Sequence, residues 1–265
     1  MGEKAAPTQG LSRATLLAVA LRSLFLESSW NLIGQQNVGF AAAVNPALRR
    51  VYQGRPADLA EARLRVLKFF NTNPMFSGLV IGAALKLEEE TAQGLLDENE
   101  RGLIVAALAS SLAIHGDLLF WQSWLPFCSL VGFGLTWLSA AQGQLTLAPL
   151  IVPALFCLLA GPARIGGLFC GYRLGRQAHT AAAKYRVPQL ARWVLRASVV
   201  LVGYLTVRAQ GLIPGREPLE RVLTVLAVLA LVLALVGAQR VWPKLGPMAL
   251  YLLIVLGLGL VAFFA

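Results

Sequence analysis

The chain has 265 residues, of which 57% are hydrophobic and only 14% are charged, and its formal net charge is +10. A soluble domain is usually about one quarter charged, so this composition, with a mean hydropathy of +0.66, excludes an ordinary soluble globular protein and indicates an integral membrane protein. The excess of Lys and Arg falls after residue 101, between apolar runs. That placement favours cytoplasmic loops and argues against a surface that binds nucleic acid.

Residues 1–101 alternate charged and amphipathic pieces, and we expect them to form the first of two regions. Within it, residues 11–26 and 58–70 each combine an apolar stripe with basic residues. This pattern predicts helices that lie at the membrane interface or pack against a partner.

Two short apolar pieces follow, residues 75–85 and 102–114, and each is too short to cross a bilayer alone. Asn73 and Pro74 suit the start of the first helix, and Gly94 can end it. The arrangement predicts a re-entrant helical hairpin that dips partway into the membrane. Two amphipathic helices on the membrane surface are the alternative.

The turn between these pieces, "EEETAQGLLDENER", begins with Glu88, Glu89 and Glu90. A run of like charges at a helix end is usually solvated. We therefore expect the three carboxylates to face water, although one of the three could still turn inward.

Residues 102–265 are expected to form a multi-span transmembrane region. Five runs are long and apolar enough to be spans, and they cover residues 118–139, 147–170, 194–210, 221–239 and 247–265. The connection over residues 172–196 carries six basic side chains and no acid, which predicts a cytoplasmic loop and, by alternation, a C-terminus outside. The expected fold class is thus an all-α integral membrane protein, with about five C-terminal transmembrane helices and an N-terminal amphipathic region that contains a re-entrant helical hairpin.

Asp117 stands at the edge of a long apolar tract, in the stretch "GDLLFWQSWLP". Ionisable residues at membrane depth are rare and usually face a bundle interior or an aqueous cavity. With Trp121 and Trp124 close behind, the carboxylate could accept sugar hydroxyls while a ring covers the apolar sugar face. In the alternative interpretation Asp117 caps the 118–139 helix and the tryptophans lie in the interfacial belt.

Asn71, Thr72 and Asn73 form a dense polar group ahead of Pro74. The group suits the tip of a broken helix that binds hydroxylated ligands. Ordinary turn and capping chemistry would use the same residue types.

The sequence contains no recognisable catalytic motif, and its two histidines, His115 and His179, have no metal-ligand spacing. We expect no catalytic residue, no metal site and no cofactor. An unrelated membrane enzyme that uses His115, Asp117 and Glu88 is kept as an alternative function.

Three stretches match a known family in order: "SSWNLIGQQNVGFAAAVNPALRRVY" (28–52), "KFFNTNPMFSGLVIGAALKLEEE" (68–90) and "GDLLFWQSWLP" (116–126). Over roughly residues 15–175 the chain resembles the enzyme IID component of mannose/fructose/sorbose-type sugar phosphotransferase systems. It departs from the family pattern at Ile33, Gly34 and Leu125, where the family commonly has charged residues.

The resemblance implies a non-enzymatic transport subunit in the bacterial cytoplasmic (inner) membrane. Such a chain pairs with a IIC-type membrane subunit, and these pairs form a higher oligomer that translocates a hexose or amino sugar. Separate IIA and IIB phosphocarrier proteins carry the phosphoryl group. The expected substrate-binding or translocation residues are Trp30, Asn31, Asn71, Thr72, Asn73, Asp117 and Trp121. Because family charges are missing, a non-transporting regulatory or sensor protein derived from the same family is the alternative.

Overall fold

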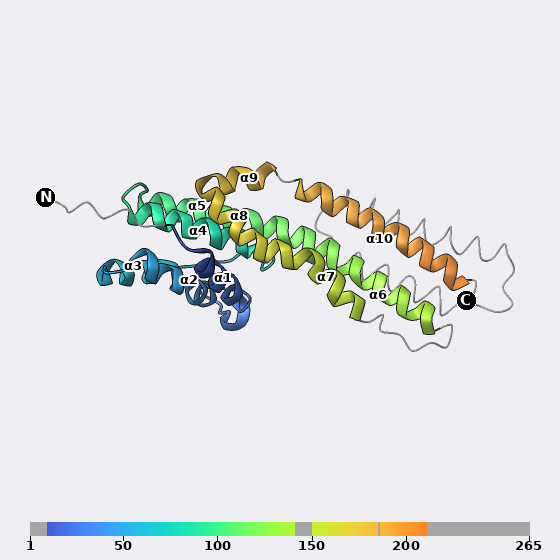
Figure 1. Ribbon diagram of the computed structural model, residues 1–265. Coiled ribbons are helices and arrows are strands. Elements are labelled where there is room, and N and C mark those ends of the chain that lie inside the picture. The colour runs from blue at the N-terminus through green and yellow to red at the C-terminus, as the bar shows by residue number, and fades with distance from the viewer. Residues whose placement is uncertain (1–9, 141–149, 185, 211–265) are drawn as a thin grey trace. The chain divides into compact units, whose positions relative to one another are not determined.

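The computed structural model describes residues 10–140, 150–184 and 186–210, which are helical apart from turns and two isolated β-bridges (Figure 1). The chain divides into two compact units, residues 1–120 with 157–188 and residues 121–156 with 189–265. The spans expected at 221–239 and 247–265, and the C-terminus, lie outside the described residues.

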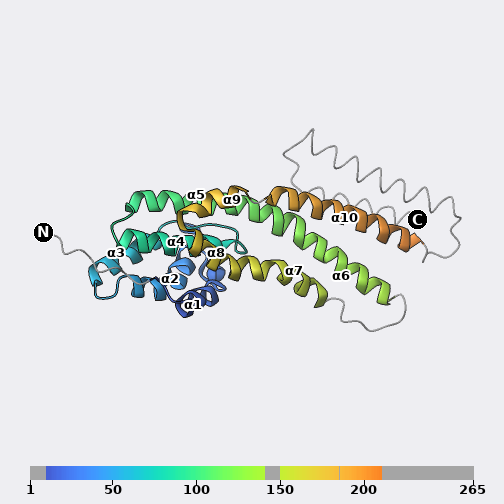
Figure 2. The same cartoon turned by 45° about the horizontal axis from the view of Figure 1, so that its top comes forward.

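The first unit is built around α4 (Ser77–Ala92), which packs against α2 (Asn37–Val51), α5 (Glu98–Gly116) and α8 (Gly167–Leu174) (Figures 1 and 2). Helix α1 (Arg13–Ser23) covers α2, and α3 (Pro56–Val66) follows α2 along the chain. The helices expected within residues 11–26 and 58–70 are therefore confirmed as α1 and α3. Their buried residues belong to the core of this unit.

Glycines bring α4 into backbone contact with α8 and with the turn before it, η4 (Pro162–Gly166). A Cβ at Gly78 would overlap the carbonyl oxygen of Arg164, and one at Gly82 would overlap that of Leu168. From the other side, a Cβ at Gly171 would overlap the carbonyl oxygen of Leu79. Small residues four positions apart are the usual means by which membrane helices pack closely.

The start and end of α4 differ in how well the sequence predicted them. Gly94 has φ +73° and ends the helix as expected. At the other end, Asn73 does not cap the helix itself. Its Oδ1 accepts from the backbone N of Met75 at 3.0 Å and closes a turn before α4 begins at Ser77.

The expectation that residues 102–114 form a separate short segment is wrong. Helix α5 continues through a π-helical stretch, η2 (Asp117–Trp124), into α6 (Leu125–Ala140). The result is one helix of 43 residues, Glu98–Ala140. The expected boundary between residues 101 and 102 falls inside its first turns.

Two described helices are long and apolar enough to cross a membrane, Glu98–Ala140 and Ile151–Ala182. The second comprises α7 (Ile151–Gly161), a π-helical turn η4 (Pro162–Gly166), α8 and, after η5 (Gly175–Gln177), most of α9 (Ala178–Lys184). The connection expected over residues 172–196 is thus mostly helical. The span expected to start at residue 194 begins earlier, because α10 covers Val187–Gln210.

In the second unit, Trp124 Nε1 donates to the carbonyl oxygen of Phe156 at 3.3 Å. Gly134 of α6 faces the side chain of Leu205 on α10, and a Cβ there would press on that leucine. Small residues again let neighbouring helices approach.

Candidate functional site

The polar loop ahead of α4 is held by Gln36. The Gln36 amide donates to the Thr72 carbonyl oxygen at 2.8 Å and accepts from the Thr72 backbone N at 3.0 Å. Its Nε2 also donates to Glu27 at 2.6 Å. Because Gln36 and Thr72 are both buried, these bonds fix the loop to the start of α2.

The fixed loop brings Asn73 against the junction of α5 and η2. Asn73 is buried, and its Nδ2 donates to Asp117 Oδ1 at 2.9 Å. A Cβ at Gly116 would overlap the Asn73 side chain, so glycine is needed there for the approach. The acid and the asparagine expected at one site are therefore in contact.

Asp117 does not cap the start of a helix over residues 118–139. Its backbone is helical, at φ −63° and ψ −42°, within the continuous Glu98–Ala140 helix, which rules out the capping interpretation. Its side chain is exposed, and its Oδ2 has no hydrogen bond among the described residues. A carboxylate oriented by one bond and open at its second oxygen can accept a ligand hydroxyl.

The helix widens where Asp117 lies. Residues Asp117–Trp124 are π-helical, and such widened turns inside α-helices are frequent at functional sites. Trp121 lies in this stretch, is partly exposed, and stacks on Phe156 with ring centroids 5.9 Å apart.

The other predicted site residues have different surroundings. Asn31 organises its own turn: Oδ1 accepts from the backbone of Ile33 and Gly34, and Nδ2 donates to Asn37 at 2.9 Å. It positions the loop and presents little to a ligand. Trp30 and Asn71 are exposed, while the Thr72 hydroxyl is buried and has no hydrogen bond to any residue that the structure describes.

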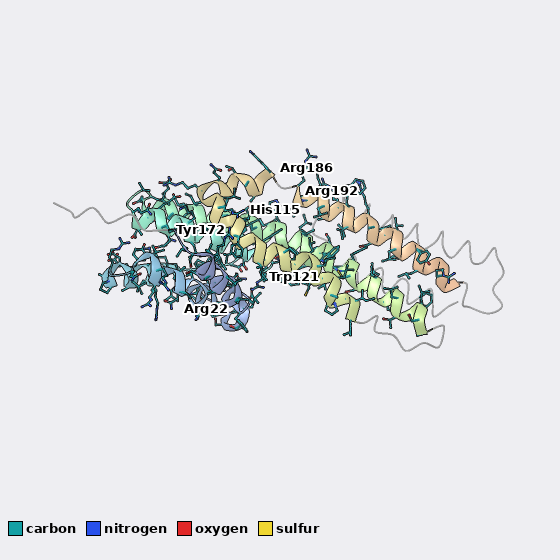
Figure 3. All side chains as sticks on the ribbon, viewed as in Figure 1. Arg22, His115, Trp121, Tyr172, Arg186 and Arg192 are labelled. Atoms are coloured by element: carbon teal, nitrogen blue, oxygen red, sulfur yellow. The ribbon has the colours of Figure 1, made fainter. Side chains whose placement is uncertain are left out.

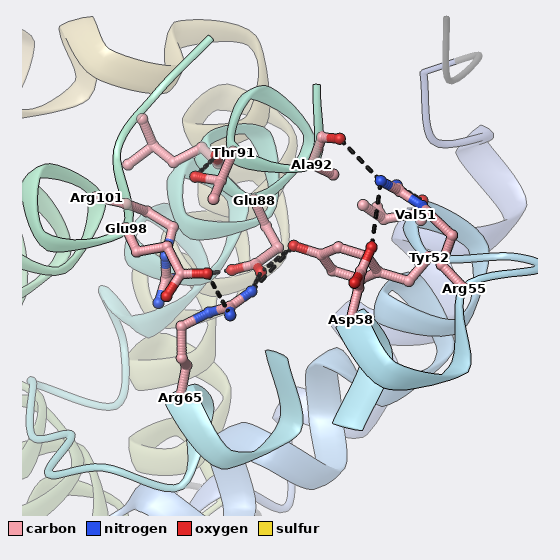
Figure 4. A network of polar contacts seen from close by, with 11 residues as sticks. Val51, Tyr52, Arg55, Asp58, Arg65, Glu88, Thr91, Ala92, Glu98 and Arg101 are labelled. Atoms are coloured by element: carbon pink, nitrogen blue, oxygen red, sulfur yellow. Dashed lines mark hydrogen bonds and ion pairs between the residues drawn. The ribbon is translucent and has the colours of Figure 1, made fainter. Parts of the chain in front are cut away.

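The expectation that Glu88, Glu89 and Glu90 form a solvated helix end is wrong for the first two. Glu88 is 1% exposed and Glu89 2%. Glu88 accepts from the Tyr52 hydroxyl at 2.7 Å and forms ion pairs with Arg65 at 2.8 Å and Arg101 at 2.9 Å (Figure 4).

The network around Glu88 joins four helices, because Tyr52 ends α2, Arg65 lies in α3, Glu88 in α4 and Arg101 in α5. Burial, together with the charge and hydrogen bond of Glu88, raises the pKa of Tyr52. The phenol therefore stays protonated and keeps donating to the carboxylate. With its charge balanced by two arginines, the network is suited to holding helices together.

Glu89 and Glu90 bind other parts of the first unit. Glu89 accepts from the Tyr172 hydroxyl at 2.6 Å and from the backbone N of Leu11 at 2.8 Å. Glu90 pairs with Arg176 at 2.6 Å. Tyr172 is labelled in Figure 3.

The surroundings of His115 do not support a metal-dependent enzyme. His115 Nδ1 lies 2.7 Å from the carbonyl oxygen of Ser111 in its own helix. Within the described ranges, no group of three His, Cys, Asp or Glu side chains could hold a metal ion.

These features define a helical protein of the membrane type, with glycine-packed helices, a buried ionic network and an oriented carboxylate on a membrane-length helix. The family model described as "PTS system mannose/fructose/sorbose family IID component" matches residues 10–213. The chain belongs to this family, as the sequence motifs indicated.

Curated relatives are named as EIID components of such systems. The mannose-specific EIID component of Escherichia coli K12 is 34% identical over 166 residues, 62% of this chain and 57% of the relative. The sorbose-specific EIID component of Klebsiella pneumoniae is 31% identical over 62% of this chain and 58% of its own length. The chain thus spans less than two thirds of the length of these relatives.

Solved structures agree with the fold. The chain is similar to the mannose transporter ManYZ in complex with microcin E492, with a TM-score of 0.58, 25% identity and 96% of each chain covered. A second membrane protein structure gives a TM-score of 0.65 at 29% identity, over 75% of this chain and 71% of that one. These neighbours support an all-helical membrane protein.

Proposed function

We propose that this chain is the membrane-embedded IID subunit of a phosphoenolpyruvate-dependent sugar phosphotransferase system, and that it forms the sugar-translocating unit with a IIC subunit. The observation that carries the proposal is the Asn73–Asp117 hydrogen bond of 2.9 Å. Family membership and a transporter complex among the structural neighbours support it.

In this proposal Asp117 accepts hydroxyl hydrogen bonds from a hexose or amino sugar. Asn73 orients the carboxylate, and the anchored loop presents the exposed Asn71 amide as a further polar group. Trp121 is retained as the ring that covers the apolar sugar face. Trp30, Asn31 and Thr72 then shape the loop region and need not touch the sugar.

Phosphoryl transfer is assigned to separate IIA and IIB components, so the proposed chain is a non-catalytic subunit. It binds the sugar and carries it across the membrane together with IIC, and the phosphocarriers modify the sugar at the cytoplasmic face. We further propose a multi-pass topology with the C-terminus outside. Labelling in intact cells of a cysteine introduced at Ala265, in a variant whose Cys128, Cys157 and Cys170 are replaced by serine, would test it.

An exposed apolar surface supports pairing with another membrane subunit. It consists of residues on α1 and the turn after it: Leu17, Leu21, Leu24, Phe25, Leu32 and Ile33. Ile33 is 91% exposed and Leu32 is 82% exposed, although large apolar side chains are costly to leave in water. We propose that IIC or lipid covers them, in a higher oligomer of IIC–IID pairs.

The departure from the family pattern at Gly34 has a local explanation. A side chain at Gly34 would overlap the amide of Asn37, and Asn37 itself donates to the Leu67 carbonyl oxygen at 2.6 Å. The packing of this turn therefore leaves no room for a side chain at residue 34. This supports a loop whose packing differs from the family pattern, and such a loop is compatible with retained transport.

The test is uptake of radiolabelled mannose, fructose, glucosamine and sorbose by cells that carry the native operon, with and without this chain. Loss of uptake of at least one sugar in the deletion, restored by the intact gene, supports the proposal. Uptake unchanged for every sugar would favour the second candidate, a regulatory membrane protein, for which the missing charges at Ile33 and Leu125 are the supporting observation.

A further inference from the structure

A cavity of about 560 Å³ lies in the first unit, away from Asn73 and Asp117. Arg13, at the start of α1, lines it from one side. From the Ile151–Ala182 helix it is lined by Gly166, Phe169, Cys170, Arg173 and Leu174.

The charge of this cavity is positive and unbalanced. Arg13 and Arg173 are exposed, and neither forms an ion pair within the described part of the chain. The lining contains no acid. By contrast, the neighbouring Arg176 is paired with Glu90, whereas the guanidinium groups of Arg13 and Arg173 stay available to a ligand in this cavity.

The rest of the lining is apolar, with Phe169, Cys170 and Leu174. A site for a free inorganic anion would surround it with hydrogen-bond donors. Here two cations stand beside an apolar wall, which fits a molecule with an anionic head and a hydrocarbon body.

The position of Arg173 on its helix also fits a molecule with an anionic head and a hydrocarbon body. Arg173 lies in the last turn of α8, near the end of a membrane-length helix. Basic side chains at such positions meet lipid headgroups, and basic pockets between membrane helices bind anionic ones. At Gly166 a Cβ would meet nothing within 4 Å, so the groove is open there.

We propose that this cavity binds one anionic phospholipid, with its phosphate held by Arg13 and Arg173 and its hydrocarbon part along Gly166 and Phe169. Guanidinium groups suit this role because they bind phosphate oxygens in pairs. The bound lipid would join α1 to the membrane-length helix. The site is independent of sugar transport by the subunit.

Two pairs of variants test the site in the purified full-length chain, together with any subunit that copurifies. Arg13→Gln/Arg173→Gln removes the charges, and Arg22→Gln/Arg50→Gln removes the same charge from exposed positions outside the cavity (Arg22 is labelled in Figure 3). Gly166→Leu fills the groove, and Gly161→Leu adds the same side chain at another open helical glycine.

The readouts are phosphatidylglycerol retained after detergent exchange, measured by mass spectrometry, and the Tm change on adding phosphatidylglycerol, phosphatidylcholine or inorganic phosphate. We expect retention and a Tm rise with phosphatidylglycerol alone. The Kd for phosphatidylglycerol, derived from the dependence of Tm on lipid concentration, should be about tenfold or more higher in Arg13→Gln/Arg173→Gln and in Gly166→Leu, as loss of about 1.4 kcal/mol of binding would give, and both variants should retain less lipid. The two control variants should match the wild type, and all Tm values without lipid serve as the folding control.

Three results would overturn the proposal. Equal retention in all variants would mean general adsorption. A Tm rise with inorganic phosphate as large as with phosphatidylglycerol would mean a free-anion site. A copurifying subunit that protects the cavity, with no lipid retained, would mean that a protein occupies it.

Discussion

Gly116 and Asn73 lie so close that a Cβ at residue 116 would overlap the Cβ of Asn73. The same approach lets the Asn73 amide reach the next residue, Asp117, at 2.9 Å. The glycine and the acid of the "GDLLFWQSWLP" stretch thus have linked roles, because the first admits the loop and the second receives its hydrogen bond. The arrangement makes specific substitutions informative.

Gly116→Ala should lower the free energy of unfolding by about 1–3 kcal/mol, because overpacking forces the loop to move. Gly102→Ala is the matched control, since Gly102 lies on the same helix and a Cβ there meets nothing within 4 Å. It should stabilise the protein by about 0.5–1 kcal/mol. Thermal unfolding of the purified protein in detergent measures both, and similar effects of the two changes would contradict the close approach.

Glu88→Ala should be strongly destabilising, by about 3–5 kcal/mol, because it leaves Arg101 unpaired in a buried position and leaves Arg65 with only the exposed Glu98 as an ion-pair partner. Glu61→Ala, an exposed acid on α3, should stay within about 0.5 kcal/mol of the wild type. Chemical denaturation in detergent compares the two. A small effect at Glu88 would mean that the charges are solvated after all.

Tyr52→Phe should change how stability depends on pH. Burial and Glu88 raise the pKa of the Tyr52 phenol in the folded chain, whereas the unfolded chain loses this proton near pH 10. The contribution of the protonated phenol is therefore complete below about pH 10 and is lost as the pH rises toward the folded-state pKa. Thermal unfolding at about pH 9 and about pH 11 should show a larger loss of stability in the wild type than in Tyr52→Phe. Equal losses would argue against the raised pKa.

Gln36→Glu should release the polar loop, because a carboxylate cannot donate to the Thr72 carbonyl oxygen and would repel Glu27. We expect a loss of about 1–3 kcal/mol in unfolding free energy, as for other buried groups that lose their partners. Gln53→Glu makes the same charge change at an exposed position and should leave the free energy of unfolding nearly unchanged. Limited proteolysis within residues 67–76 would report whether the loop has opened.

Local patterns predicted much of the first unit. The apolar stripes of residues 11–26 and 58–70 became α1 and α3, and Gly94 ended α4, because these features depend on neighbours within a few residues. Asn73 and Asp117 were both predicted from the sequence as site residues, and the structure places their side chains in contact.

Other features depended on distant partners. Gly116 and Asp117 resemble a helix break in sequence, but the glycine is there for the Asn73 loop and the helix continues. The burial of Glu88 could not be predicted locally, because Tyr52 and Arg65 reach it from two other helices. A charge run shows only that acids are present, and long-range packing decides which of them are buried.

The central claim is that Asp117 lies on the sugar path of a transport subunit, and uptake by Asp117→Asn tests it most directly. The substitution keeps the size of the side chain but removes a charged acceptor, whose hydrogen bonds are worth about 1.5–3 kcal/mol, so uptake should fall about tenfold or more. Asp97→Asn is the matched control, because Asp97 caps α5 and asparagine caps equally well. Membrane levels of both variants should equal those of the wild type. Normal uptake by Asp117→Asn, in cells whose uptake depends on this chain, would contradict the claim.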